Sequence, residues 1–156
     1  MDDLRLVTYC GLYCDLCSQR SRTPEQAKAL KKTLKKEGFE FWGKDLPGYE
    51  QFWTLLGNLS DIEKVCSGCR QGGGNPGCEI RKCIKEKNIE VCCFCDEYPC
   101  EKINGLAEIY PTLIADGTKL KQLGTEAWLE KQKARKETGF AYCDIRYPYP
   151  HLTENS

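Results

Sequence analysis

The chain has 156 residues, with 23 basic and 23 acidic side chains that cancel to a formal net charge of zero at pH 7. A neutral chain has no long-range field to attract nucleic acid or an anionic membrane, and no apolar run approaches the roughly 20 residues that a membrane helix needs. Leu, Ile, Val and Phe make only 32 of the residues, whereas cysteine occurs 12 times. The sequence therefore predicts one small domain that depends on its cysteines as well as on an apolar core.

The first predicted elements are an extended segment, LRLVTY at residues 4–9, and a helix that starts near Thr23. Thr23 is the expected N-cap, Pro24 takes the first helical position, and Gln26 completes a capping box. Gly38 is expected to end this helix. Its apolar stripe is narrow and the rest of its surface is rich in lysine, which predicts a solvated lysine face.

An aromatic stretch follows and predicts the main core helix, starting at about Pro47. Its apolar residues recur at helical spacing, and they are Tyr49, Phe52, Trp53, Leu56 and Leu59. Residues 66–100 then hold eight of the 12 cysteines around a glycine-rich loop, and this segment is not expected to make a conventional core. From about Gly105 the chain is predicted to be helical again, before a partly ordered tail.

These elements predict a single domain over residues 1–156. Its fold class is mainly α with cysteine-rich, metal-stapled loops, small and irregular, with little β structure. A helical part is expected at 22–60, a cysteine-rich metal-binding part at 66–100, C-terminal helices at 101–137 and a tail at 144–156.

The cysteines suggest either disulfides or metal ligands. Residues 1–9 start with MDD and lack the apolar core of a secretory signal. A cytoplasmic location is therefore expected, and there repeated C-x2-C pairs bind metal more often than they form disulfides.

Ten cysteines are candidate metal ligands, because thiolates bind zinc tetrahedrally and a C-x2-C turn lets two sulfurs reach one metal. The pairs Cys66–Cys69 and Cys92–Cys95 are separated by 22 residues, a spacing that predicts one four-thiolate site. A second site would take its ligands from six further cysteines, which are Cys10, Cys14, Cys17, Cys78, Cys83 and Cys100.

Some of these cysteines carry more specific expectations. Cys78 and Cys83 can face one metal only if Cys78 precedes the helix that contains Cys83, because five residues on a continuous helix rotate the second sulfur by about 140°. Cys100 is expected to open another helix. Cys93 duplicates its neighbour and Cys143 is isolated, so both are expected to be spare thiols.

The stretch YCGLYCDLC, residues 9–17, spaces its cysteines as C-x3-C-x2-C. Radical enzymes that use S-adenosylmethionine hold a four-iron cluster with this pattern. Such an enzyme is not favoured, because Leu16 stands where those enzymes usually have an aromatic residue and because a full barrel runs to about 250 residues.

Four segments together resemble an uncharacterised cysteine-rich family of bacterial and archaeal proteins. They are YCGLYCDLC, CSGC, CEIRKCIKEKNIEVCCFCDEYPC and GTEAWLEKQ, and they span Tyr9 to about Lys133. The family is known as a domain of unknown function and is often labelled as a candidate zinc-binding domain. Its members often have a further cysteine pair after the helix with EAWL, whereas this chain has only Cys143 there.

The leading interpretation is an intracellular metal-binding protein that holds two or more zinc ions and serves as a structural or binding module. The alternative is an iron-sulfur protein with a [4Fe-4S] cluster and a redox or sensing role, because four thiolates suit either group. A binding module is favoured over an enzyme, since the only histidine, His151, lies in the tail and no G-x-S-x-G turn is present. The sequence leaves a protein partner open and identifies no substrate.

Overall fold

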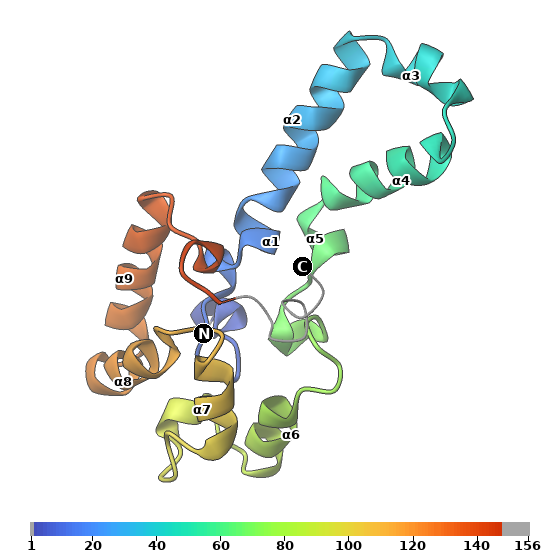
Figure 1. Cartoon of the computed structure of the whole chain (residues 1–156). Helices are drawn as coiled ribbons and strands as arrows, with labels where there is room; N and C mark the ends of the chain where they lie inside the picture. Colours follow the sequence, from blue (N-terminus) through green and yellow to red (C-terminus); the bar gives the residue numbers. More distant parts are fainter. Residues whose placement is uncertain (1, 148–156) are drawn as a thin grey trace. The chain divides into compact units, whose positions relative to one another are not determined.

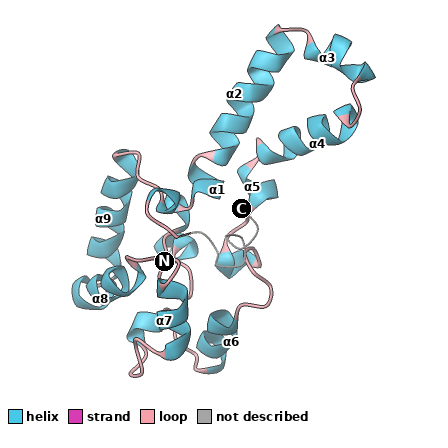
Figure 2. Ribbon diagram, viewed as in Figure 1, coloured by secondary structure: helices cyan, strands magenta, loops and turns pink. Residues whose placement is uncertain are grey.

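The computed structural model describes residues 2–147, which belong to two compact units (Figure 1). Ser18–Ser67 form one, called here the hairpin unit, and Met1–Cys17 with Gly68–Ser156 form the other, called the cysteine unit. The described part of the chain consists of helices and loops and contains no strand (Figure 2). The mainly α-helical fold class is therefore confirmed. The predicted tail beyond residue 147, with His151, lies outside the described residues.

The hairpin unit contains two longer helices and three single-turn helices. Its elements are α1 (Ser18–Ser21), α2 (Thr23–Lys36), α3 (Phe39–Trp42), α4 (Tyr49–Leu59) and α5 (Ile62–Val65). The predicted helix is α2, and its predicted end is confirmed, because Gly38 follows it with a φ of 72°. Only glycine adopts that left-handed conformation without a steric penalty.

The predicted N-cap at Thr23 is wrong by one position. Thr23 is the first residue of α2, and the capping position is Arg22, which has helical backbone angles and makes no side-chain cap. The chain enters α2 from α1 in an already helical conformation. Thr23 therefore does not have the extended backbone from which a threonine caps a helix.

The aromatic stretch does form a helix, α4, but it is not the main core helix. The Phe39 ring is the centre of its packing, with ring centroids 5.3 Å from Tyr49 and 5.7 Å from Trp53. Tyr49 and Leu56 are the buried residues of α4. The two large apolar clusters of the molecule lie in the cysteine unit instead.

The cysteine unit combines four helices with several 3-10 turns. The helices are α6 (Glu79–Glu86), α7 (Glu101–Ala107), α8 (Leu113–Leu123) and α9 (Thr125–Glu137), and the 3-10 turns are Asp2–Leu6, Cys14–Leu16, Cys69–Gln71, Cys92–Phe94 and Tyr142–Asp144. Among the described helices, none is long and apolar enough to span a bilayer.

The start of the chain differs from the predicted extended segment. Residues 2–6 form a 3-10 turn, and only Val7 is paired, in an isolated antiparallel bridge with Tyr13. The chain reverses between them around Gly11, which has a φ of 96°. No second strand lies alongside, so the extended backbone does not continue beyond the bridge.

The cysteine-rich segment contributes to the core, contrary to expectation. Val91 and Cys93 are fully buried in a first apolar cluster with Trp128 of α9, and Cys92 is 6% exposed in a second cluster with Ile84 of α6. Short side chains of cysteine behave as small apolar groups when buried. Residues 91–93 therefore contribute to both apolar clusters. Val91 and Cys93 belong to the first cluster, and Cys92 belongs to the second.

Candidate metal centre

Two of the three C-x2-C segments form the same backbone turn. The N–H of Cys17 donates to the carbonyl oxygen of Cys14 at 2.9 Å, and the N–H of Cys95 donates to that of Cys92 at 3.0 Å. In both turns the last cysteine is extended, with φ near −75°. A turn of this kind lets two sulfurs approach one metal.

The third C-x2-C segment has a different conformation. Cys66 is extended and belongs to the hairpin unit, where its carbonyl oxygen accepts a hydrogen bond from the guanidinium of Arg20. Cys69 begins a 3-10 turn of the cysteine unit after Gly68, which has a φ of 98°. The backbone of the Cys66–Cys69 segment therefore differs from that of the Cys92–Cys95 turn.

Two further thiols lie at helix starts. Cys78 is the N-cap residue of α6, one position before the helix that carries Cys83. The condition under which both thiols could face one metal is thus met. Cys100 is the N-cap residue of α7, so its predicted position at a helix start is also confirmed.

Cys92 lies among several other thiols. The pKa of Cys92 is raised to about 12, first by burial and then by the charges of neighbouring thiolates, those of Cys10, Cys100, Cys83 and Cys95. The packing brings three other thiols to the same region, because Cys10, Cys78 and Cys100 all lie against the apolar cluster that contains Cys92.

Cys10 links this group to another set of thiols. Its Sγ is hydrogen-bonded to the Thr8 hydroxyl at 3.0 Å. Burial raises the pKa of Cys10, the Thr8 hydrogen bond lowers it, and the charges of Cys69 and Cys78 raise it. Thiols that are far apart in the sequence are therefore neighbours around Cys10.

Arg70 holds the segments that carry these thiols. Its Nε donates to the Val7 carbonyl at 2.6 Å, and its terminal nitrogen donates to the Glu90 carbonyl at 2.6 Å. Its guanidinium also lies 4.6 Å from the centroid of the Tyr9 ring. One side chain next to Cys69 thus fastens the backbone before Cys10 to the backbone before Cys92.

Lys87 contacts the C-x2-C turn of Cys92 and Cys95. Its Nζ donates to the Cys95 Sγ at 3.6 Å and forms an ion pair with Glu97 at 2.9 Å. The Glu97 hydrogen bond raises the pKa of Lys87. Sequence reasoning missed Arg70 and Lys87, because no spacing rule relates a lone basic residue to a thiol that it approaches only after folding.

The remaining cysteines have varied surroundings. Cys93 is fully buried in the first apolar cluster, where burial raises its pKa to about 11. Cys143 is exposed. Cys14 is buried and Cys17 is half-buried beside it on the turn that packs against α9. That Cys93 and Cys143 are spare remains a prediction.

The donor chemistry of the thiol groups fits a metal, but their sulfurs do not converge. None of the 12 cysteines, which all lie within the described residues, forms a disulfide. Within residues 2–147, no group of three or more His, Cys, Asp or Glu side chains is arranged to hold a metal ion. Coordination would therefore require movements of the thiols and of the turns that carry them.

Comparison with known proteins agrees with the resemblance seen in the sequence. A family model described as a protein of unknown function (DUF3795) matches residues 6–105. The matched region contains 11 of the 12 cysteines and ends soon after Cys100. No curated protein and no solved structure matches the chain. Because the match covers well over half of its length, the chain belongs to the DUF3795 family of proteins of unknown function.

Proposed function

We propose that the chain binds metal and that its principal site is formed by four thiolates, those of Cys83, Cys92, Cys95 and Cys100. The observation that carries this proposal is the gathering of thiols around the buried Cys92. Three different elements supply them: the helix α6, the turn Cys92–Phe94 and the start of α7. A metal bound there would join these elements by bonds that the apolar cluster alone does not provide.

Zinc is the proposed metal. Four thiolates form a closed tetrahedral site, which leaves no open position for a substrate and has no redox chemistry. Such a site stabilises a fold. We therefore propose a structural or binding module that acts in the cytoplasm through a protein partner, rather than an enzyme.

A second metal is proposed at the thiols of Cys10, Cys69 and Cys78. The charges of Cys69 and Cys78 act on Cys10, and Cys10 and Cys78 pack against the same apolar cluster. The fourth ligand would come from the other candidates of the cysteine unit, which are Cys14 and Cys17. With this site the chain would hold two or more metal ions.

The alternative is a [4Fe-4S] cluster at the principal site. Four thiolates suit that cluster as well as zinc. It is favoured by one feature, the Lys87 Nζ at 3.6 Å from the Cys95 Sγ. Hydrogen bonds to cluster sulfurs set reduction potentials, so this contact has a clear role in an electron carrier.

Elemental analysis of protein purified without oxygen tests the proposal. We expect zinc, and we expect the Cys100→Ser variant to bind about one zinc ion fewer than wild type. The Cys143→Ser variant is the matched control and should keep the full content. Iron with acid-labile sulfide would select the alternative, and metal-free protein would refute both.

A further inference from the structure

Lys87 lies at the end of α6, one helical turn after a candidate ligand. Its backbone N–H donates to the carbonyl oxygen of Cys83 at 3.0 Å. The next residue, Asn88, has a φ of 52°, and the N–H of Ile89 donates to the carbonyl oxygen of Ile84 at 3.1 Å. This is the left-handed helix end that asparagine adopts more readily than most other residues with a side chain. The end of α6 therefore fixes the position of Lys87 relative to Cys83.

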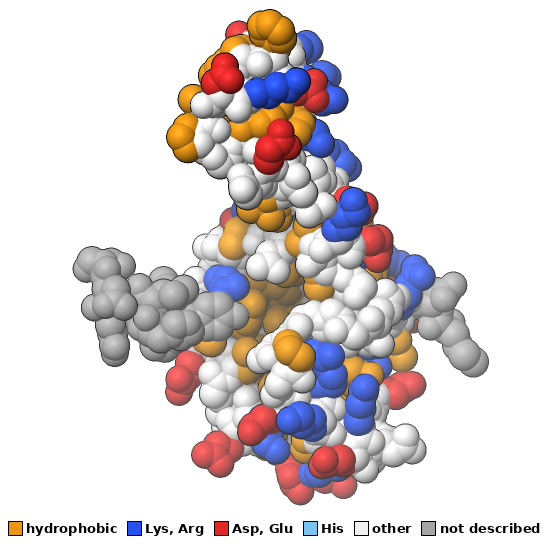
Figure 3. All heavy atoms as spheres, turned by 90° about the vertical axis from the view of Figure 1, so that its right-hand side faces the viewer, with side chains coloured by type: hydrophobic (Ala, Val, Ile, Leu, Met, Phe, Trp, Pro, Cys, Tyr) orange, Lys and Arg blue, Asp and Glu red, His pale blue; other side chains and the backbone are white. Residues whose placement is uncertain are grey.

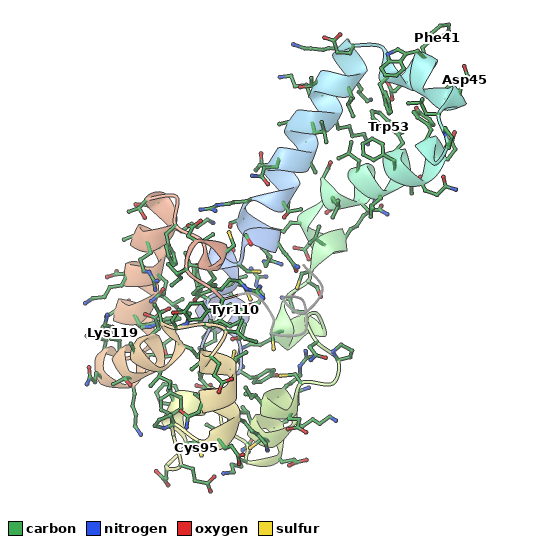
Figure 4. The ribbon with its side chains drawn as sticks, viewed as in Figure 1. Phe41, Asp45, Trp53, Cys95, Tyr110 and Lys119 are labelled. Carbon is green, nitrogen blue, oxygen red and sulfur yellow. The ribbon has the colours of Figure 1, made fainter. Side chains whose placement is uncertain are left out.

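The Lys87 side chain contacts two residues of the loop that follows the Cys92–Phe94 turn. Its Nζ donates to the Cys95 Sγ at 3.6 Å and forms an ion pair with the Glu97 carboxylate at 2.9 Å. Figure 4 shows Cys95 in the part of the cysteine unit that also contains α6 and α7. One ammonium group therefore connects the end of the helix that carries Cys83 to the loop that carries Cys95.

Solvent screens the two contacts of Lys87 differently. The Glu97 side chain is 72% exposed and the Lys87 side chain is 34% exposed, whereas Cys95 is half-buried. An exposed ion pair contributes little to stability, because water and salt screen it. The hydrogen bond between an ammonium group and a half-buried thiolate is screened less and is strengthened by both charges. Glu97 therefore mainly orients the Lys87 side chain, and the chemical effect of the cation is on the Cys95 sulfur.

The surface around this contact is not a general basic patch. Figure 3 shows basic and acidic side chains interspersed on one face of the cysteine unit. The sequence of α6, EIRKCIKE, contains three basic and two acidic residues, so its charges nearly cancel. A mixed surface of this kind does not concentrate anions from solution. The cation of Lys87 therefore acts locally, on the sulfur that it contacts.

We propose that Lys87 is a positioning residue of the principal metal site, where its ammonium group orients the Cys95 thiolate and offsets part of the charge of the site. The inference rests on the proposed function, because Cys83 and Cys95 are two of the four proposed ligands. Four thiolates and one divalent zinc ion together carry two negative charges, and a partly buried charge needs a partner. Residues that hydrogen-bond to metal ligands typically change metal affinity by about 10- to 100-fold.

Competition of the full chain with a chromophoric chelator measures the zinc affinity of each variant. Lys87→Met keeps an unbranched side chain and removes the charge, and it should lower the zinc affinity at least about tenfold. Lys87→Arg should restore most of the affinity, because a guanidinium group also donates to sulfur. Lys82→Met is the matched control, since it makes the same change at an exposed position of the same helix. It should leave the affinity unchanged.

Cobalt in place of zinc gives a second measurement, which a loss of folding stability alone would not change. A hydrogen bond to a thiolate lowers the energy of the sulfur lone pair. Its loss in Lys87→Met should therefore move the charge-transfer band from sulfur to cobalt to longer wavelength, and Lys87→Arg should return the band toward its wild-type position. Circular dichroism checks that each variant keeps its helices, and Lys87→Gln replaces Lys87→Met if that variant does not fold.

The outcomes separate this inference from the proposed function. Wild-type protein that binds neither zinc nor cobalt would overturn the zinc site and this inference with it. If wild type binds zinc and Lys87→Met binds it equally well, only the inference is overturned. A lower affinity without a shift of the cobalt band would show a merely structural role for Lys87 and would also overturn it. The same holds for an equal loss of affinity in Lys82→Met, because the effect would then come from surface charge in general.

Discussion

The backbone N–H of Cys92 donates a hydrogen bond to the carbonyl oxygen of Tyr9 at 2.8 Å. This bond joins the residue before the first cysteine of the chain to the centre of the cysteine-rich segment. Gly11 lies against the same segment, because a Cβ added there would be 3.7 Å from the Val91 side chain. The first residues of the opening motif therefore lie against the cysteine-rich segment.

Protein purified without oxygen should not cleave S-adenosylmethionine when reduced. Radical enzymes leave one iron of the cluster free for this cofactor, whereas the neighbours of Cys10 include Cys69 and Cys78, from outside the opening motif. We expect at least two of the opening thiols to join later cysteines around a metal. Chromatography of the reaction for 5′-deoxyadenosine checks this, and its production above background would contradict the expectation.

Removal of metal by a strong chelator should reduce the helical content. The helices α6 and α7 have 8 and 7 residues, and helices shorter than about 12 residues are marginal without tertiary contacts. If a metal joins them, its binding energy is also folding energy. Far-ultraviolet circular dichroism before and after chelation measures the change. Complete retention of the signal in protein shown to be metal-free would argue against a structural role.

Cys92→Ser should damage the protein much more than Cys143→Ser. The first variant leaves three thiolates around a divalent cation and also places a hydroxyl in an apolar cluster. The second changes an exposed residue. Soluble yield and metal content of the two variants provide the comparison, and Cys66→Ser can be ranked between them. Equal soluble yield and equal metal content for Cys92→Ser and Cys143→Ser would show that Cys92 is not a ligand.

Arg70→Lys should destabilise the cysteine unit by about 2 kcal/mol, because a lysine cannot make both hydrogen bonds to the Val7 and Glu90 carbonyls. Because lysine keeps the positive charge, a loss of stability would come from the lost hydrogen bonds and not from a change of charge. Urea unfolding of the metal-loaded protein measures the difference. Lys85→Arg, a change next to the same Tyr9 ring, is the control and should be close to neutral.

Tyr142→Phe should reduce the alkaline sensitivity of stability. The buried Tyr142 hydroxyl accepts the Tyr13 N–H at 2.9 Å, and burial raises the pKa of Tyr142 above its ordinary value of 10.0. A raised folded-state pKa stabilises the protein below pH 10, and that stability is lost as the pH rises through the folded pKa. The variant should cost about 1 kcal/mol at pH 8 for the lost hydrogen bond.

The difference between wild type and Tyr142→Phe should therefore shrink as the pH rises above 10. Urea unfolding at pH 8 and at a pH above 10 gives both values. The comparison between variants matters, because other tyrosines and cysteines titrate in the same range. A difference that stays constant or grows with pH would mean that the phenol is not held neutral by burial.

The sequence predicted the features that depend on local chemistry. Gly38 ends α2 because of its backbone freedom, and Cys100 precedes a helix as expected. It did not predict the division into two units or the burial of residues 91–93, since both depend on contacts between distant segments. Arg70 was missed for the same reason, because its two acceptors are 63 and 20 residues away in the sequence.

The cysteine unit is discontinuous, because residues 18–67 are inserted between its first 17 residues and the rest. During synthesis, Cys92 leaves the ribosome 75 residues after Cys17. At ribosomal speed this delay is roughly 4 to 15 seconds. In that interval the nascent chain presents Cys10, Cys14 and Cys17 without Cys92, Cys95 and Cys100. We expect correct assembly to depend on a reducing environment and on metal that reaches the chain only after the insertion is complete.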